Sequence, residues 1–131
     1  MNYKNLRFEI ENNIGRIILN RPEAANAITI PLVKELLDIA IKCESGAPVR
    51  VLVLQGEGSI FCAGGDLKYM TEQENLREAI SEMIGILHVA LSKIDHLDAP
   101  LIGAITGTAA GAGLSLVSAC DMAGAGKNVK F

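Results

Sequence analysis

The sequence has no tryptophan, and aromatic residues make up only 4% of its 131 residues, although half of all residues are hydrophobic. A core packed from aliphatic side chains is therefore expected, and the composition excludes a disordered chain. The sequence also lacks a cluster of basic residues, and its net charge is −3. Because binding to nucleic acid depends on Lys and Arg side chains that meet phosphates, we expect no nucleic-acid partner.

Cysteine is scarce and shows no metal-binding spacing. Cys43, Cys62 and Cys120 are odd in number and far apart in the chain. We therefore expect reduced thiols, a cytoplasmic protein and no metal site. The first twelve residues are polar and charged, which argues against a signal peptide. Residues 99–120 carry no charge and contain glycines at GxxxG spacing, but a proline, several hydroxyl side chains and flanking aspartates argue against a membrane helix.

Hydrophobic periodicity predicts strands and helices in alternation. Residues 6–10 and 16–20 form a β-hairpin around a turn at residues 12–15. One helix begins near Pro31 with Thr29 as its cap. That helix is predicted to end at residues 45–48. Strands buried on both faces are predicted at 49–54 and 101–106, with a loop at 55–65. Further along are a long amphipathic helix at 76–94, a buried helix at 114–120 and an extended segment from 123. This order indicates βαβ units and an α/β fold.

Small residues gather in two turns, residues 61–67 and 107–113, and each turn follows a predicted buried strand. In an open parallel sheet, ligands bind at the carboxyl ends of the strands. Small residues leave the main-chain N–H groups accessible, and a helix that begins there adds a positive dipole. Two such amides on one carbonyl oxygen would form an oxyanion hole, which suits chemistry through a thioester enolate. The spacing alone leaves open whether the two turns converge. Neither turn has a dinucleotide or P-loop pattern, so nucleotide binding is not supported.

Three motifs in a fixed order resemble those of the crotonase superfamily, the enoyl-CoA hydratase/isomerase family. Residues 16–27, RIILNRPEAANA, are similar to its N-R-P-x-x-x-N-A signature, and residues 61–67, FCAGGDL, are similar to its F-x-A-G-x-D-[LI] loop. Residues 107–113, GTAAGAG, with the later Ala119-Cys120-Asp121, resemble its glycine-rich turn and C-D segment. The resemblance implies a crotonase-like ββα spiral. It also implies that residues 1–131 are the N-terminal part of such a domain, without its C-terminal portion.

The resemblance also assigns site residues. It implies that the amides of Gly65 and Ala112 form the oxyanion hole, and that small residues line the groove for the coenzyme A part of an acyl-CoA thioester. The groove positions are Ala25, Ala27, Ala63, Gly64, Asp66, Leu67 and Gly111. Asp66 is expected to cap a helix in preference to touching substrate. Arg21 and Lys68 are either contacts for CoA phosphates or solvated surface charges, and His88 and His96 are surface or boundary residues.

One position departs from the family pattern. Ser115 stands where the hydratases carry an acid/base glutamate, and serine cannot act as the carboxylate that activates a water. The resemblance therefore favours double-bond isomerisation over hydration, with a base beyond Phe131 and no cofactor. It also implies a homotrimer or hexamer for the full-length protein, and an inactive, poorly soluble or oligomeric product when residues 1–131 are made alone. The alternatives are thioester hydrolysis, decarboxylation, a non-catalytic acyl-CoA binder and an inactive fragment.

Overall fold

The computed structural model describes residues 3–127 and 129–131. Its first element is the predicted β-hairpin, in which β1 (Leu6–Glu11) pairs antiparallel with β2 (Ile14–Leu19). The turn between them consists of Asn12 and Asn13 alone, and both adopt left-handed φ values, 53° and 65°. Two consecutive residues with positive φ match the right-handed twist of the strands that they join, and asparagine tolerates this conformation better than most residues. The predicted turn at 12–15 was therefore too long, because β2 already begins at Ile14.

The main sheet continues in parallel after the hairpin. Its other strands are β3 (Val51–Gly56), β5 (Leu101–Ile105) and β7 (Met122–Ala125), in the order β1-β2-β3-β5-β7. Each parallel step is made by a crossover that contains a helix, as the predicted βαβ pattern requires.

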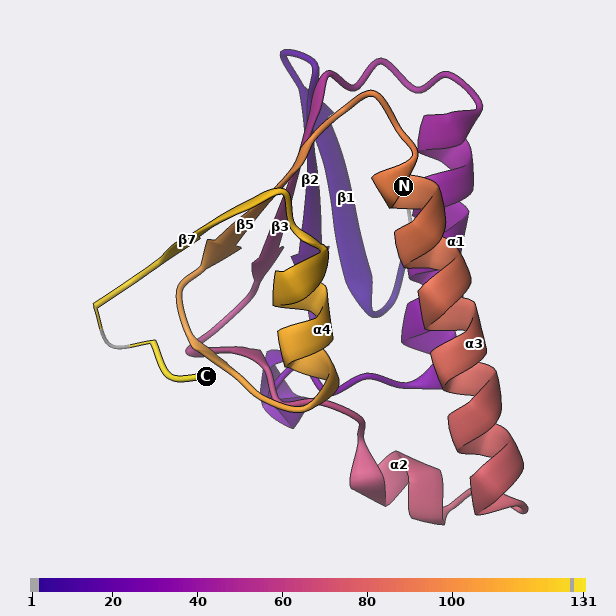
Figure 1. Cartoon of the computed structure of the whole chain (residues 1–131). Helices are drawn as coiled ribbons and strands as arrows, with labels where there is room; N and C mark the ends of the chain where they lie inside the picture. Colours follow the sequence, from indigo (N-terminus) through magenta and orange to yellow (C-terminus); the bar gives the residue numbers. More distant parts are fainter. Residues whose placement is uncertain (1–2, 128) are drawn as a thin grey trace.

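Two long helices lie side by side on one face of this sheet (Figure 1). The first, α1 (Ile30–Glu44), starts where predicted, because the Thr29 hydroxyl oxygen accepts a 3.3 Å hydrogen bond from the Leu32 amide. The second, α3 (Leu76–Asp95), is capped in the same way by Asn75, whose side chain accepts from the Glu78 amide at 3.1 Å. A shorter helix, α4 (Ala112–Ala119), covers the same face nearer to β5.

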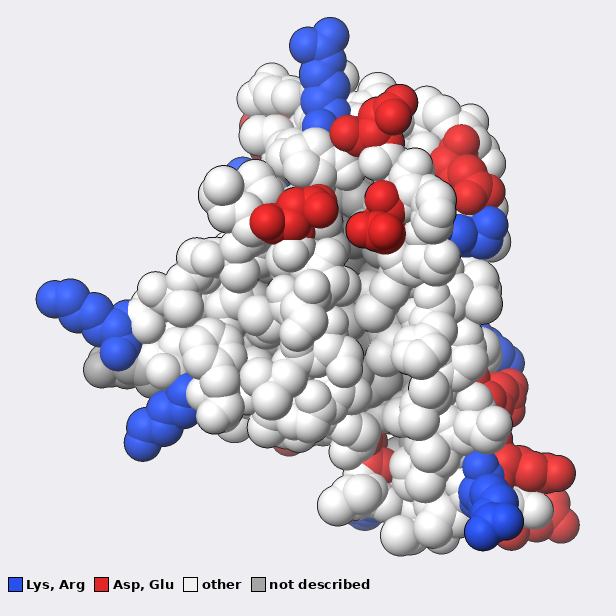
Figure 2. All heavy atoms as spheres, viewed as in Figure 1, with Lys and Arg blue, Asp and Glu red and all other residues white. Residues whose placement is uncertain are grey.

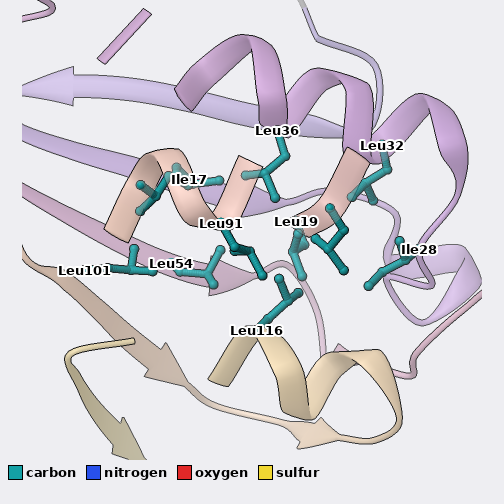
Figure 3. Close-up of a pocket in the computed structure, with 11 residues that line it drawn as sticks. Ile17, Leu19, Ile28, Leu32, Leu36, Leu54, Leu91, Leu101 and Leu116 are labelled. Atoms are coloured by element: carbon teal, nitrogen blue, oxygen red, sulfur yellow. The ribbon is translucent and has the colours of Figure 1, made fainter. Parts of the chain in front are cut away.

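The core lies between the helices and the sheet. Leu52 and Leu54 of β3 point into it and are buried, whereas Val51 and Val53 on the opposite face are half-buried. The prediction that the parallel strands are buried on both faces was therefore wrong, since helices of the described chain cover one face only. Figure 3 shows the centre of this core, where aliphatic side chains surround an enclosed gap of about 10 Å³. Its lining is Ile17, Leu19, Ile28, Leu32, Leu36, Leu54, Leu87, Leu91, Ile94, Leu101 and Leu116. A gap this small and apolar stays dry.

Short elements occupy two segments that the sequence predicted as irregular. A two-stranded parallel sheet of β4 (Ile60–Cys62) and β6 (Thr108–Ala109) joins the predicted loop at 55–65 to the predicted turn at 107–113. The remaining elements are the 3₁₀ turn η1 (Pro22–Ala24) and the short helix α2 (Leu67–Thr71). Strands of two or three residues give no periodic signal, and here each one exists only because the other pairs with it.

The end of the described chain is more exposed than predicted. In α4, expected to be a buried helix, Leu114 is 38% exposed and Ser115 and Ser118 are also at the surface. All four residues of β7 are exposed. Figure 2 shows that the surface over α4 carries no charged side chains, which lie instead toward the edges of the view. Among the helices described, none is both long enough and apolar enough to cross a membrane.

Candidate functional site

The two glycine-rich turns predicted from the sequence touch each other. In the small sheet Cys62 is paired with Ala109, and the amide of Ala110 donates a 3.0 Å hydrogen bond to the Cys62 carbonyl. A Cβ placed on Gly64 would lie 3.1 Å from the Ala110 oxygen and 3.5 Å from the Ala112 nitrogen. Gly64 also has a φ of 103°, which favours glycine. The close approach of the two turns therefore depends on the absence of a side chain at this residue.

The main chain around Gly65 is anchored on one side only. The amide of Ile28 donates to the Gly64 carbonyl at 2.8 Å, and the amide of Asp66 donates to the Ile28 carbonyl at 2.9 Å. In a parallel bridge of this kind both bonds flank the paired residue, so the N–H of Gly65 points away from Ile28. Within residues 3–127 and 129–131, the Gly65 amide donates no main-chain hydrogen bond.

The second predicted donor, Ala112, is the first residue of α4. Amides in the first turn of a helix have no partner inside that helix. Those of Gly113 and Leu114 are bonded back to Ala110 and Gly111, at 2.8 and 3.0 Å, whereas the Ala112 amide makes no such bond in the described chain. The site therefore combines two adjacent turns in which the amides of Gly65 and Ala112, and also those of the preceding Gly64 and Gly111, donate no main-chain hydrogen bond within the described residues. Whether the Gly65 and Ala112 amides reach one oxygen stays a prediction.

A loop with two left-handed residues supports the Gly65 turn from the other side. Ala25 and Asn26 have φ values of 56° and 54°, and the Ala25 carbonyl accepts from the Ala63 amide at 3.1 Å. Asn26 is fully buried. Its carbonyl oxygen accepts from the Arg21 amide, and its NH₂ group donates to the carbonyls of Glu57 and Ile60, all at 2.8 Å. One side chain thus joins the loop to the segment that leads into β4.

Sequence reasoning placed Asn26 inside a motif but gave it no role. The available signal was its position as a polar residue just before the apolar start of α1. A buried amide is stable only when its donors and acceptor are paired, and here the main chain supplies all three partners.

Asp66 caps α2, as predicted. One carboxylate oxygen accepts from the Tyr69 amide at 3.0 Å. The other accepts from the guanidinium of Arg21 at 3.1 Å, and Arg21 donates from its second terminal nitrogen to the Ala27 carbonyl at 2.6 Å. The hydrogen bond from Tyr69, together with the nearby Arg21 charge, holds the pKa of Asp66 below its usual range. Arg21 is thus engaged within the fold, whereas Lys68, the other candidate for CoA phosphates, is exposed.

The other predicted site residues differ in exposure. Ala63, Gly111 and Ser115 are exposed, and Leu67 is 78% exposed, which is unusual for leucine. Ala25, Gly65 and Ala112 are half-buried, whereas Gly64 and Ala27 are buried. The structure brings the 25–28, 63–66 and 110–112 segments together through the contacts above. Ser115 lies on α4, three residues beyond Ala112, and His88 and His96 are surface residues, as predicted.

The cysteines are not activated. Burial raises the pKa of the thiols of Cys43 and Cys62. Burial, assisted by the charge of Asp121, raises the pKa of Cys120 to about 11. Within the described residues there is no group of His, Cys, Asp and Glu side chains that could hold a metal ion.

Comparison with known proteins identifies the class. The model of the enoyl-CoA hydratase/isomerase family matches residues 9–131, so the chain belongs to that family and has the crotonase fold. It is 37% identical over 117 residues to an enoyl-CoA isomerase/hydratase of Mycosarcoma maydis, covering 82% of this chain and 42% of that protein. A trans-2-decenoyl-[acyl-carrier-protein] isomerase of Streptococcus mutans is 29% identical over 139 residues, covering 100% and 51%.

A solved structure gives the same result. The crystal structure of an enoyl-CoA hydratase of Mycobacterium smegmatis superposes with a TM-score of 0.84 at 30% identity, covering 96% of this chain and 49% of that one. The chain thus spans about half the length of the relatives that it matches.

Proposed function

We propose that this chain supplies the part of an enoyl-CoA hydratase/isomerase family enzyme that holds an acyl thioester and stabilises its enolate. The supporting observation is the contact between two turns in which the amides of Gly65 and Ala112 are among those without a main-chain acceptor in the described chain. An oxyanion needs such preorganised donors, and the loss of one costs roughly 3–4 kcal/mol of barrier in other enzymes. The positive end of α4 adds to the effect, because Ala112 is its first residue.

The substrate in this proposal is an acyl thioester, and no further cofactor takes part because coenzyme A arrives with the substrate. The names of the relatives support this class, since they refer to enoyl-CoA and to a decenoyl group on acyl-carrier protein. Ala63, Gly111 and Leu67 are exposed beside the turns, where the thioester and its carrier arm would lie in this proposal. A homotrimer or hexamer of the full-length protein, located in the cytoplasm, is part of the same proposal.

Isomerisation is favoured over hydration because Ser115 replaces the hydratase carboxylate. In isomerisation, one base removes a proton from C2 of a 3-enoyl thioester, and the electrons move onto the thioester oxygen between the two amides. The same proton is then returned at C4, which leaves the double bond between C2 and C3. This reaction adds no water, so it does not require a carboxylate at Ser115.

The oxyanion role can be tested at Ala112 without disturbing the helix. Proline is well tolerated at the first position of a helix and has no N–H, so Ala112→Pro removes the donor and spares α4. Ala112→Ser keeps the amide and is the matched control. In the full-length protein, called the unmodified chain below, binding of acetoacetyl-CoA, which presents an enolate oxygen, is compared with binding of CoA, which has no carbonyl there.

We expect the unmodified chain to prefer acetoacetyl-CoA, and Ala112→Pro to reduce that preference by about tenfold or more, as for the loss of a hydrogen bond to a charged group. Ala112→Ser should keep it. An unmodified chain without a preference, or a proline variant that retains it, would contradict the proposal.

The choice between isomerisation and hydration is tested at Ser115. In the full-length enzyme we expect isomerisation of 3-enoyl-CoA to exceed hydration of crotonyl-CoA, and Ser115→Glu to raise the rate of hydration. Ser115→Gln has a similar size and no carboxylate, so it should not. Efficient hydration by the unmodified enzyme would show that its water is activated elsewhere.

A further inference from the structure

Arg21 and Asp66 form the most shielded ion pair that the structure describes. Their side chains are 18% and 14% exposed, whereas the side chains in every other described pair are 32% exposed or more. The pair links the loop after β2 to the residue that directly follows Gly65. We propose that Arg21 is a positioning residue, which acts through Asp66 to hold the Gly65 amide in the orientation that an oxyanion requires. This inference rests on the proposed function.

The hydrogen bonds around Gly65 form a closed path. Arg21 is bonded to the Asp66 carboxylate and to the Ala27 carbonyl. From Ala27 the chain runs directly to Ile28, which is bonded to the main chain of both Gly64 and Asp66. Gly65 therefore lies between two anchored neighbours, and the guanidinium closes the path on the side of Asp66.

Each oxygen of the Asp66 carboxylate has a separate task. One caps α2 through the Tyr69 amide, and the other binds Arg21. A cap alone fixes the start of a helix, but it does not fix where that start lies relative to the loop before α1. The main-chain bonds of Ile28 restrain that position, and Arg21 adds a side-chain restraint, because it is bonded to a carbonyl of the loop itself. A rigid geometry of this kind is what keeps a donor in place for a developing charge.

The hydrogen bonds and the low exposure of Arg21 favour a positioning role over contact with substrate. Both terminal nitrogens of Arg21 are already bonded to oxygens of the fold, at 2.6 and 3.1 Å, and little of the side chain is exposed. A guanidinium that served CoA phosphates would have to give up these partners, and separation of a shielded ion pair is costly.

A second ion pair offers a matched control. Arg7 and Glu57 meet at 3.0 Å and join β1 to the segment after β3, but their side chains are 45% and 46% exposed. Neither side chain contacts the two turns through any bond found in the described chain. An effect specific to positioning should therefore appear at Arg21 and not at Arg7.

The test uses the full-length protein and five variants: Arg21→Gln, Arg21→Lys, Asp66→Asn, the double variant Arg21→Gln/Asp66→Asn, and Arg7→Gln. Asp66→Asn keeps an oxygen that can cap α2, so it removes the ionic link and spares the helix start. The measured quantity is the preference for acetoacetyl-CoA over CoA, with amide hydrogen exchange at Gly64–Asp66 recorded by NMR and the unfolding midpoint as a check on folding. A general loss of stability would weaken the binding of both ligands alike. Misplacement of the Gly65 amide would weaken the binding of acetoacetyl-CoA alone.

We expect Arg21→Gln and Asp66→Asn each to lower the preference about tenfold and to speed exchange at Gly64–Asp66, because each breaks the same charge-assisted bond. The double variant should lower the preference for acetoacetyl-CoA no further than either single variant does. Arg21→Lys restores the charge but not both bonds, so it should recover part of the preference. Arg7→Gln should leave both readouts unchanged.

The outcomes separate this inference from the proposed function. If the unmodified chain prefers acetoacetyl-CoA and Arg21→Gln retains that preference, the positioning role is wrong and the oxyanion proposal stands. If Arg21→Gln weakens binding of CoA and of acetoacetyl-CoA equally while the unfolding midpoint is unchanged, Arg21 binds the coenzyme instead, which also overturns positioning. An unmodified chain without any preference overturns both proposals.

Discussion

The two turns and the helix–sheet core of this protein are stabilised by different interactions. In the turns, shape is set by the main chain: Ala25, Asn26, Gly64 and Gly111 all have positive φ. In the core, shape is set by burial of aliphatic side chains around a gap of about 10 Å³. A core of this kind tolerates substitutions that conserve volume, whereas a turn with one permitted main-chain path tolerates few. The candidate site lies in the turns, which tolerate fewer substitutions than the core.

The largest expected effect is a loss of stability caused by a substitution in the core. Leu54 is 2% exposed and lines the central gap, so Leu54→Ala should lower the free energy of unfolding by about 3–4 kcal/mol, through lost burial and an enlarged cavity. Val53 is the matched control, because it lies next along β3 on the half-buried face. Val53→Ala should cost about 1 kcal/mol, as for a partly buried side chain. Equal losses in urea denaturation would mean that the outer face of the sheet is packed as well as the inner one.

The core was largely predictable from the sequence, and the reason is periodicity. Thr29 and Pro31 marked the start of α1, the bend at 45–48 marked its end, and the long helix at 76–94 was found to within one residue. Burial on both faces of β3 and β5 was predicted wrongly. A run of β-branched residues shows that a strand is apolar, but not whether a second layer covers it.

The turns were predictable only in part. Small residues after buried strands indicated where a ligand would bind, and family resemblance named the amides. The pairing of β4 with β6 and two of the three bonds of Asn26 join residues more than 30 positions apart, and no local pattern encodes such contacts. The bond from Arg21 to Asp66 was missed for the same reason, since the two residues are 45 positions apart.

The second prediction concerns substitutions of Asn26, which supports the turns. Asn26→Ala would leave the Glu57 and Ile60 carbonyls and the Arg21 amide without their partner, and should cost about 2–3 kcal/mol of unfolding free energy. Asn26→Gly also removes the side chain but accepts the φ of 54° without strain. The glycine variant should therefore be the more stable of the two, by about 1 kcal/mol. Chemical denaturation of both variants separates the hydrogen bonds from the strain, and a stable alanine variant would mean that water replaces the side chain.

A third prediction sharpens the comparison with two helical glycines. A Cβ on Gly113 in α4 would lie 2.5 Å from the Cys62 carbonyl oxygen, so Gly113→Ala should destabilise the protein by about 2 kcal/mol. A Cβ on Gly85 in α3 would have no neighbour within 4 Å. Gly85→Ala should therefore stabilise the protein, by about 0.5–1 kcal/mol, because alanine favours a helix interior. Thermal unfolding should show shifts of opposite sign, and shifts of the same sign would contradict the close approach of α4 to β4.

The smallest expected effect concerns the pH dependence of stability at Asp66. Its pKa in the folded protein is lowered, chiefly by the hydrogen bond from the Tyr69 amide and also by Arg21. A carboxyl group whose pKa is lowered by folding adds stability above its unfolded pKa of about 4, and that stability is lost as the pH falls through the folded pKa. The difference in unfolding free energy between the unmodified chain and Asp66→Asn should thus be constant above about pH 5 and shrink below pH 4.

The same titration in an Arg21→Gln background assigns the cause. Because the hydrogen bond from the Tyr69 amide is the largest single cause of the lowered pKa and Arg21 is a further cause, the pH-dependent difference should be smaller there but still present. Asp38→Asn provides the comparison outside the turns, because the pKa of Asp38 is also lowered, by the hydroxyl of Tyr3 and by Lys42. Its contribution should not change when Arg21 is replaced, since these groups lie on α1 and the N-terminal segment. If Arg21→Gln abolished the Asp66 difference altogether, the ion pair and not the helix cap would set that pKa, and the Gly65 turn would depend on Arg21 even more than proposed.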